Sequence, residues 1–257
     1  MTCVERAEPT RIPSPARLVI ATPPADLAPF PGLTEDGFSF LKSLKRNNDR
    51  EWFQARKETY HDELRDPMRM LVADLSRRLP DRGIPLSGDP KRAVFRIYRD
   101  TRFSKNKAPY KTHVAAALHR NGVKGSPGAL YIHVEPGANR VGGGFWRADR
   151  DFLRHWRTRL SEDPDTFLRI VEGVEGAGLK METAGSPLTR MPRGFEDQRE
   201  NPAVDYFQWR GGFAALHEGI ADEDVASPAF ADLVLETAET VRPLLEYGWS
   251  IADAAAK

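Results

Sequence analysis

The chain has 257 residues, with 38 lysines and arginines against 37 aspartates and glutamates, so its formal net charge is +1. Its composition, 40% hydrophobic and 29% charged, is that of a globular protein and excludes a chain that is disordered throughout. The near-neutral total argues against a protein that coats DNA through bulk charge. The sequence lacks a run of about eighteen apolar residues that could span a membrane. The single cysteine, Cys3, fits a reducing compartment, so we expect a cytoplasmic protein.

The N-terminal segment, residues 1–29, is rich in proline and poor in large apolar side chains. Such a segment cannot bury enough surface to offset the entropy lost on ordering. We therefore predict a disordered extension over residues 1–29, followed by a single α+β domain over residues 30–257.

Helical spacing of apolar residues begins directly after this extension. Thr34 is a candidate N-cap for the first helix. Asn48 stands three residues before Glu51, as in a capping box, which predicts the start of a second helix. Pro67 is suited to the first turn of a third helix.

The middle of the chain changes to the alternating pattern of strands over residues 93–99, 112–119 and 130–134. The loops between these segments are too short for crossover helices, so the strands should pair antiparallel. The predicted fold class is α+β, an antiparallel sheet of at least three meandering strands with helices packed on one face. The other face should be polar or form a cleft. The glycines at 142–144 predict a turn between a strand and a helix.

The rest of the chain is predicted to be mostly helical. Helices are expected from Asp149 and from Pro164, followed by a loop-rich region with short strands over residues 173–205. Two further helices should follow, one capped by Ser227 and a last one that restarts at Pro243.

Charge is unevenly distributed along the chain. Residues 91–124 contain ten bases and one acid, Asp100, so this segment carries +9 and the remainder of the chain −8. Residues 196–257 hold thirteen acids against four bases. A strongly basic segment inside a folded domain raises the question of which anion it meets.

The leading hypothesis is that the loop over residues 101–111 and its flanks bind a phosphate or carboxylate group. Arginine offers bidentate contacts, lysine offers point charges, and hydroxyls add neutral donors, while the one acid would orient an arginine. The predicted ligand-binding residues are Arg96, Arg99, Asp100, Arg102, Ser104, Lys105, Lys107, Tyr110 and Lys111. A phosphorylated small molecule is the expected partner, and an enzyme acting on it is one version of this hypothesis. No catalytic residue or cofactor follows from the sequence.

Two alternatives use the same segment. In the first, it belongs to a nucleic-acid-binding module, because Phe103 and Tyr110 interleave with the basic residues and could stack on bases. These aromatic residues could equally anchor the loop to the body of the protein. In the second, the protein is structural, and the basic segment pairs with the acidic C-terminal half.

The histidines of the polar face do not predict a metal site. Two of His113, His119 and His133 could approach within ligand distance, but the sequence does not fix the strand register. HExxH and cysteine-rich spacings are absent from the sequence, so we predict no metal.

The segment FRIYRDTRFSKNKAPYKTHVA, residues 95–115, resembles the hallmark of a conserved bacterial and fungal family, the domain of unknown function 2461. The residues 47–53, the glycines 142–144 with Trp146, and the residues 192–195 are similar to further family positions. Asn106 stands where the family leads us to expect Asp. The resemblance implies no activity, substrate or catalytic residue.

Overall fold

The computed structural model describes residues 29–146 and 148–256. The predicted N-terminal extension therefore lies, apart from Pro29, outside the described residues, as does Cys3. None of the helices in the described part of the chain is long and apolar enough to cross a membrane.

The described residues form a sheet of six strands, all antiparallel, in the order β1-β2-β3-β4-β6-β5. Their bounds are β1 Leu86–Ser87, β2 Val114–Arg120, β3 Ala129–Val134, β4 Asn139–Phe145, β5 Lys180–Thr183 and β6 Phe213–Ile220. The strands β2, β3 and β4 follow one another as a meander. This confirms the predicted α+β class and its antiparallel, meandering sheet.

The helices fall into three groups. Before the sheet come α1 Glu35–Arg46, α2 Arg50–Gln54, α3 Lys57–Tyr60, a π-helical turn His61–Arg65 and α4 Asp66–Asp81. Between strands lie α5 Pro90–Ala93, α6 Arg150–Glu162, α7 Pro164–Gly176, a 3-10 turn Gln198–Glu200 and α8 Val204–Phe207. The chain ends with α9 Asp222–Val225 and α10 Phe230–Ala255.

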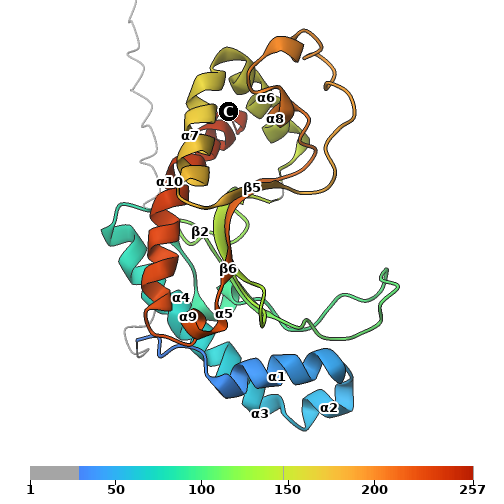
Figure 1. Ribbon diagram of the computed structural model, residues 1–257, viewed down its shortest axis with the longest axis vertical. Helices are drawn as coiled ribbons and strands as arrows, with labels where there is room; N and C mark the ends of the chain where they lie inside the picture. Colours follow the sequence, from blue (N-terminus) through green and yellow to red (C-terminus); the bar gives the residue numbers. More distant parts are fainter. Residues whose placement is uncertain (1–28, 147, 257) are drawn as a thin grey trace, which may run out of the picture.

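Figure 1 shows how these groups surround the sheet. The long helix α10 runs along one face, with α4 beside it, while α6, α7 and α8 gather around its C-terminal end and α1 to α3 lie at the opposite end of the molecule. The helix face of the sheet is apolar, since Ile132, Val141 and Phe145 are buried there. The prediction of helices on one face is therefore confirmed.

Several local predictions are confirmed at the caps. The side chain of Thr34 accepts a hydrogen bond from the backbone of Gly37 and caps α1, and Asp149 caps α6 in the same way. Pro67 lies in the first turn of α4. The cap of α2 is Asp49, not Asn48, because the Asp49 carboxylate accepts from the Trp52 amide at 2.8 Å.

The predicted strand over residues 93–99 is wrong. Asp89 caps the backbone amides of Lys91 and Arg92, so the chain turns through α5 before it reaches the sheet. The following residues form only isolated bridges, Val94 with Ala116 and Tyr98 with Tyr110. The alternating pattern therefore belongs to an irregular edge beside β2.

The glycines 142–144 form the interior of β4, not a turn, so that prediction is also wrong. A Cβ atom on Gly142 would lie 2.1 Å from the Ala215 carbonyl oxygen, and one on Gly143 would lie 2.6 Å from Val241 Cγ2. Glycine is needed here because β6 and α10 approach the strand so closely. The predicted restart at Pro243 is wrong as well, since α10 continues through this exposed residue.

Candidate functional site

The basic loop, which we define as residues 96–111, is held to the N-terminal helices by Asn48. The Asn48 amide nitrogen donates to the Tyr110 carbonyl at 3.0 Å, and the Tyr110 amide donates to Asn48 Oδ1 at 3.0 Å. A side-chain amide that pairs with both backbone groups of one residue acts like a short piece of sheet ladder. Asn48 therefore fixes the end of the loop in place of capping α2.

The ring of Tyr110 is a second anchor. It is buried and stacks on Phe53 of α2, with ring centroids 4.1 Å apart and an angle of 20° between the planes. Tyr98 also packs against Tyr110, with a centroid distance of 5.4 Å. Of the two predicted roles of Tyr110, this geometry corresponds to anchoring the loop.

The tip of the loop is ordered by its own polar side chains. Asp100 accepts two hydrogen bonds from the Arg102 guanidinium, at 3.0 and 2.7 Å, and this contact lowers the pKa of Asp100 and raises that of Arg102. Lys107 donates to the Thr101 carbonyl at 3.0 Å. Asn106 Oδ1 accepts from the Ala108 amide at 2.9 Å, a turn that an aspartate carboxylate would also make.

Three basic side chains of the loop face solvent. Arg96, Lys105 and Lys107 are exposed, and among residues 29–146 and 148–256 no carboxylate lies within 4.0 Å of them. Phe103 is 95% exposed, so it does not anchor the loop. Figure 1 shows the green part of the chain that contains this loop extending away from the sheet, on the side opposite α10.

Three further predicted residues are partly buried at the loop's base and tip. Arg99 donates to the Ala108 carbonyl at 3.3 Å. Lys111 lies over the Phe95 ring, 5.4 Å from its centroid, and burial lowers the pKa of its ammonium group. Ser104 is half-buried, and its backbone amide donates to the Thr101 carbonyl.

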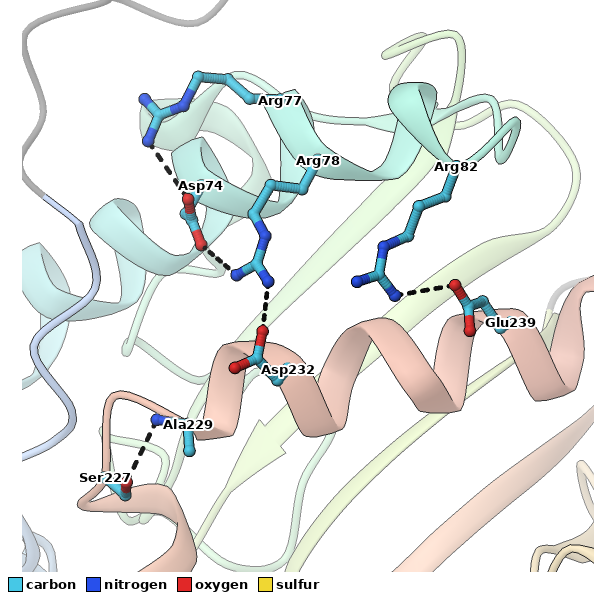
Figure 2. A network of polar contacts seen from close by, with 8 residues as sticks. All are labelled: Asp74, Arg77, Arg78, Arg82, Ser227, Ala229, Asp232 and Glu239. Carbon is cyan, nitrogen blue, oxygen red and sulfur yellow. Dashed lines mark hydrogen bonds and ion pairs between the residues drawn. The ribbon is translucent and has the colours of Figure 1, made fainter.

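Two ion pairs join the acidic C-terminal half to α4 and its C-cap residue. Figure 2 shows Arg78 in contact with Asp232 and Arg82 in contact with Glu239, the latter at 2.8 Å. Within the described ranges, the one ion pair between residues 91–124 and the acidic half joins Arg120 to Asp253 at 2.8 Å. Among the residues that the structure describes, ion pairing of the basic segment with the C-terminal half is therefore confined to this contact.

On the face of the sheet opposite α10, small residues lie beside the larger polar side chains. The register places Ala117 beside Tyr131 and Tyr131 beside Gly142, and it places Ala115 beside His133 and His133 beside Arg140. Small neighbours therefore leave room for the larger side chains of Tyr131 and His133 on the central strand β3. This polar face follows the prediction from the alternating pattern.

A polar cluster stands at the end of β3 on this face. His113 and His133 lie with ring centroids 4.2 Å apart, and His133 Nε2 is 3.4 Å from Glu135 Oε2. The Tyr131 hydroxyl is 2.9 Å from His133 Nδ1, and Thr112 donates to Glu135 Oε1 at 3.1 Å. The sequence left the register open, and the pairing of Ala115 with His133 decides it. His119 pairs with Ala129 instead and lies outside the cluster.

Burial sets the charge state of this cluster. It lowers the pKa of His113, and it lowers the pKa of His133 to about 4, so both rings are neutral near pH 7. Burial acts to raise the pKa of Glu135, but hydrogen bonds from Thr112 and His133 hold it below its usual value. The cluster therefore combines two neutral imidazoles with one carboxylate.

The described residues line two hollows, of which one reaches the cluster. One of about 280 Å³ is lined by Lys42, Lys45, Arg46, Thr112 and Glu135, so it reaches the cluster from the side of α1. Another of about 110 Å³ lies at the β1 end of the sheet, with His119, Arg92 and Lys124 in its wall. Lys45 contacts Glu135 Oε1 at 3.6 Å in the first hollow.

Fold and site together define an α+β protein whose antiparallel sheet has one helix-covered face and one polar face beside a basic loop. Residues 36–247 match the family described as "Conserved hypothetical protein (DUF2461)". This match covers most of the chain, so the protein belongs to the domain of unknown function 2461 family, as the resemblance predicted. No curated protein and no solved structure matches the chain.

Proposed function

We propose that the protein binds a ligand that carries a phosphate or carboxylate group at the basic loop. The observation that supports this most is the uncompensated charge of Arg96, Lys105 and Lys107, which are exposed and, in the described part of the chain, have no carboxylate within 4.0 Å. Loops fixed on a rigid scaffold are common binding elements, and this loop is fixed by Asn48 and Tyr110.

The loop also contains groups that complement a tetrahedral or planar anion. The Arg102 guanidinium already makes a bidentate contact with the carboxylate of Asp100, and a ligand anion would compete for the same donors. Lys105 and Lys107 supply point charges, and the Ser104 hydroxyl supplies a neutral donor. Tyr110 is left out of this ligand set because its ring is buried against Phe53.

A thermal-shift measurement tests the proposal. Inorganic phosphate, pyrophosphate and citrate are compared with sodium chloride at equal ionic strength, so that general screening cancels. We expect at least one of these anions to raise the melting temperature of the wild type. The double variant Lys105→Gln/Lys107→Gln should lose this shift, whereas Lys57→Gln, an exposed lysine of α3, should keep it. No shift beyond that of chloride, or an equal shift in the double variant, would overturn the proposal.

A second candidate is a nucleic-acid-binding module, and the exposure of Phe103 favours it. This ring is 95% exposed beside the Arg102 guanidinium, which lies 5.9 Å from the ring centroid, and Tyr98 is 52% exposed. Exposed aromatic rings among cations suit base stacking on single strands.

Fluorescence anisotropy with a labelled single-stranded DNA separates the two candidates. Nucleic-acid binding predicts an affinity that falls steeply between about 50 and 200 mM salt. Phe103→Ala should then weaken binding while leaving any phosphate-induced thermal shift intact. Binding that is absent at low salt, or insensitive to Phe103→Ala, contradicts this candidate.

A further inference from the structure

We propose that His113, His133 and Glu135 form a binding site for one divalent transition-metal ion, of the class of zinc or ferrous iron. One ligand atom from each of these residues lies within 4.8 Å of the other two. His133 lies in β3, Glu135 directly follows that strand, and His113 directly precedes β2, with which β3 pairs. The site is distinct from the basic loop and does not depend on anion binding there.

The distances suit a metal ion more closely than an ordinary hydrogen-bonded group. Two ligands of a tetrahedral zinc ion, each about 2.0 Å from the metal, are about 3.3 Å apart. His133 Nε2 and Glu135 Oε2 are 3.4 Å apart, which is long for a hydrogen bond between these atoms. Completion of the site requires a shift of His113, which is partly exposed.

The surroundings hold the ligands in the orientation that a metal requires. The Tyr131 hydroxyl contacts His133 Nδ1 at 2.9 Å, which turns Nε2 toward the carboxylate. Thr112 and Lys45 both contact Oε1 of Glu135, which leaves Oε2 for the metal. Metal-binding histidines and carboxylates are commonly fixed by outer contacts of this kind.

The donor set agrees with this assignment. Two nitrogens and one oxygen are the donor set that zinc and ferrous iron accept, whereas magnesium and calcium prefer oxygen alone.

Three protein ligands leave an open coordination position. Lys45 faces the cluster from α1, and the positive charges of Lys111 and Arg140 act on the histidines. These cations favour an anionic fourth ligand, such as hydroxide or a ligand carboxylate. The hollow of about 280 Å³ that is lined by Thr112 and Glu135 gives an ion a path to the site.

The test is a calorimetric titration of the full chain, stripped with chelator and free of any affinity tag, with Zn²⁺ alone in a chloride buffer without phosphate. We expect about one ion per chain. His133→Gln and Glu135→Gln should each weaken binding by roughly tenfold or more. His119→Gln serves as the matched control because His119 lies on the same face but outside the cluster, and it should bind as the wild type does.

A spectroscopic readout and a folding control complete the experiment. Co²⁺ should give visible d–d absorption in the wild type that is lost in His113→Gln and Glu135→Gln. Circular dichroism of the metal-free variants reports folding, and these two variants carry the test if His133→Gln fails to fold. Negligible Zn²⁺ binding, equal weakening by His119→Gln, or Mg²⁺ binding as tight as Zn²⁺ binding would overturn the proposal. Each outcome is independent of the phosphate experiment.

Discussion

At the scale of single residues, Asn48 connects the basic loop to the N-terminal helices. Its amide pairs with both backbone groups of Tyr110, a residue 62 positions away in the chain. The stacking of Tyr110 on Phe53 supports the same junction. The loop is therefore attached at a defined point while its tip remains exposed.

We predict that Asn48→Ala lowers the free energy of unfolding by about 1–3 kcal/mol, because two partly buried backbone groups lose their partner. Urea denaturation measures this change. Asn47→Ala is the matched control, since the Asn47 side chain makes a hydrogen bond to Ser43 that is exposed, and it should cost less than about 0.5 kcal/mol. Equal costs for the two variants would contradict the role assigned to Asn48.

The free energy of unfolding should depend on pH in part through His119. Burial lowers its pKa, and its Nδ1 lies 3.3 Å from the Ser126 carbonyl. The unfolded state then binds a proton at a higher pH than the folded state does, so stability falls as pH drops below about 6.5. We expect His119→Gln to reduce the slope of this fall, measured by urea denaturation between pH 5 and 8. An unchanged slope in His119→Gln would contradict the account.

At the scale of elements, β4 is the strand on which β6 and α10 converge. Its glycines allow this convergence, because a side chain at any of the three positions would meet a neighbour. In the sheet, β4 lies between β3 and β6 and pairs with both. Close packing of β4 therefore supports β3, the strand that carries His133 and Tyr131.

We predict that Gly144→Ala destabilises the protein by about 3 kcal/mol or more, because its Cβ would lie 2.2 Å from the Phe213 carbonyl oxygen. Gly173→Ala in α7 is the control, since nothing lies within 4 Å of its Cβ position. That change should stabilise the protein by about 0.5–1 kcal/mol through helix propensity. Thermal denaturation of both variants checks the pair, and a tolerated Gly144→Ala would contradict the close approach.

At the scale of the whole molecule, the net charge of +1 is the sum of a basic region and an acidic region that lie apart. Two acids of α10 contact Arg78 of α4 and Arg82 at its C-cap (Figure 2), whereas the basic loop projects from the other side of the sheet (Figure 1). The basic loop therefore remains available for a ligand, although the sequence as a whole is balanced.

We predict that Arg82→Gln changes the free energy of unfolding by less than about 1 kcal/mol, because Arg82 and Glu239 are 38% and 50% exposed. Raising the salt concentration should reduce even this difference. Denaturation at low and high salt measures the effect, and a loss above about 2 kcal/mol would show that the α4–α10 contacts matter more than their exposure indicates.

The sequence predicted the structure best where a feature depends only on residues close together in the chain. The cap Thr34, the start of a helix near Asp149, the alternation in β2 and β3, and the family membership were all predictable. The strand β4 was not, because three glycines have no side-chain alternation. The segment 93–99 alternates, but it begins at the end of α5 and then forms only isolated bridges instead of a strand.

The basic loop was identified from its charge, but the polar cluster was not. Whether His113, His119 or His133 approach one another depends on the register of β2 and β3, which is a long-range property. The cap role expected of Asn48 failed for the same reason, since its partner lies far along the chain.

The most direct test of the central claim is a map of amide chemical shifts by two-dimensional NMR during titration with pyrophosphate at constant ionic strength. The account predicts saturable shifts concentrated in residues 96–111 that are lost in Lys105→Gln/Lys107→Gln. Shifts concentrated elsewhere, or an absence of saturable shifts, would contradict binding of an anion at the basic loop.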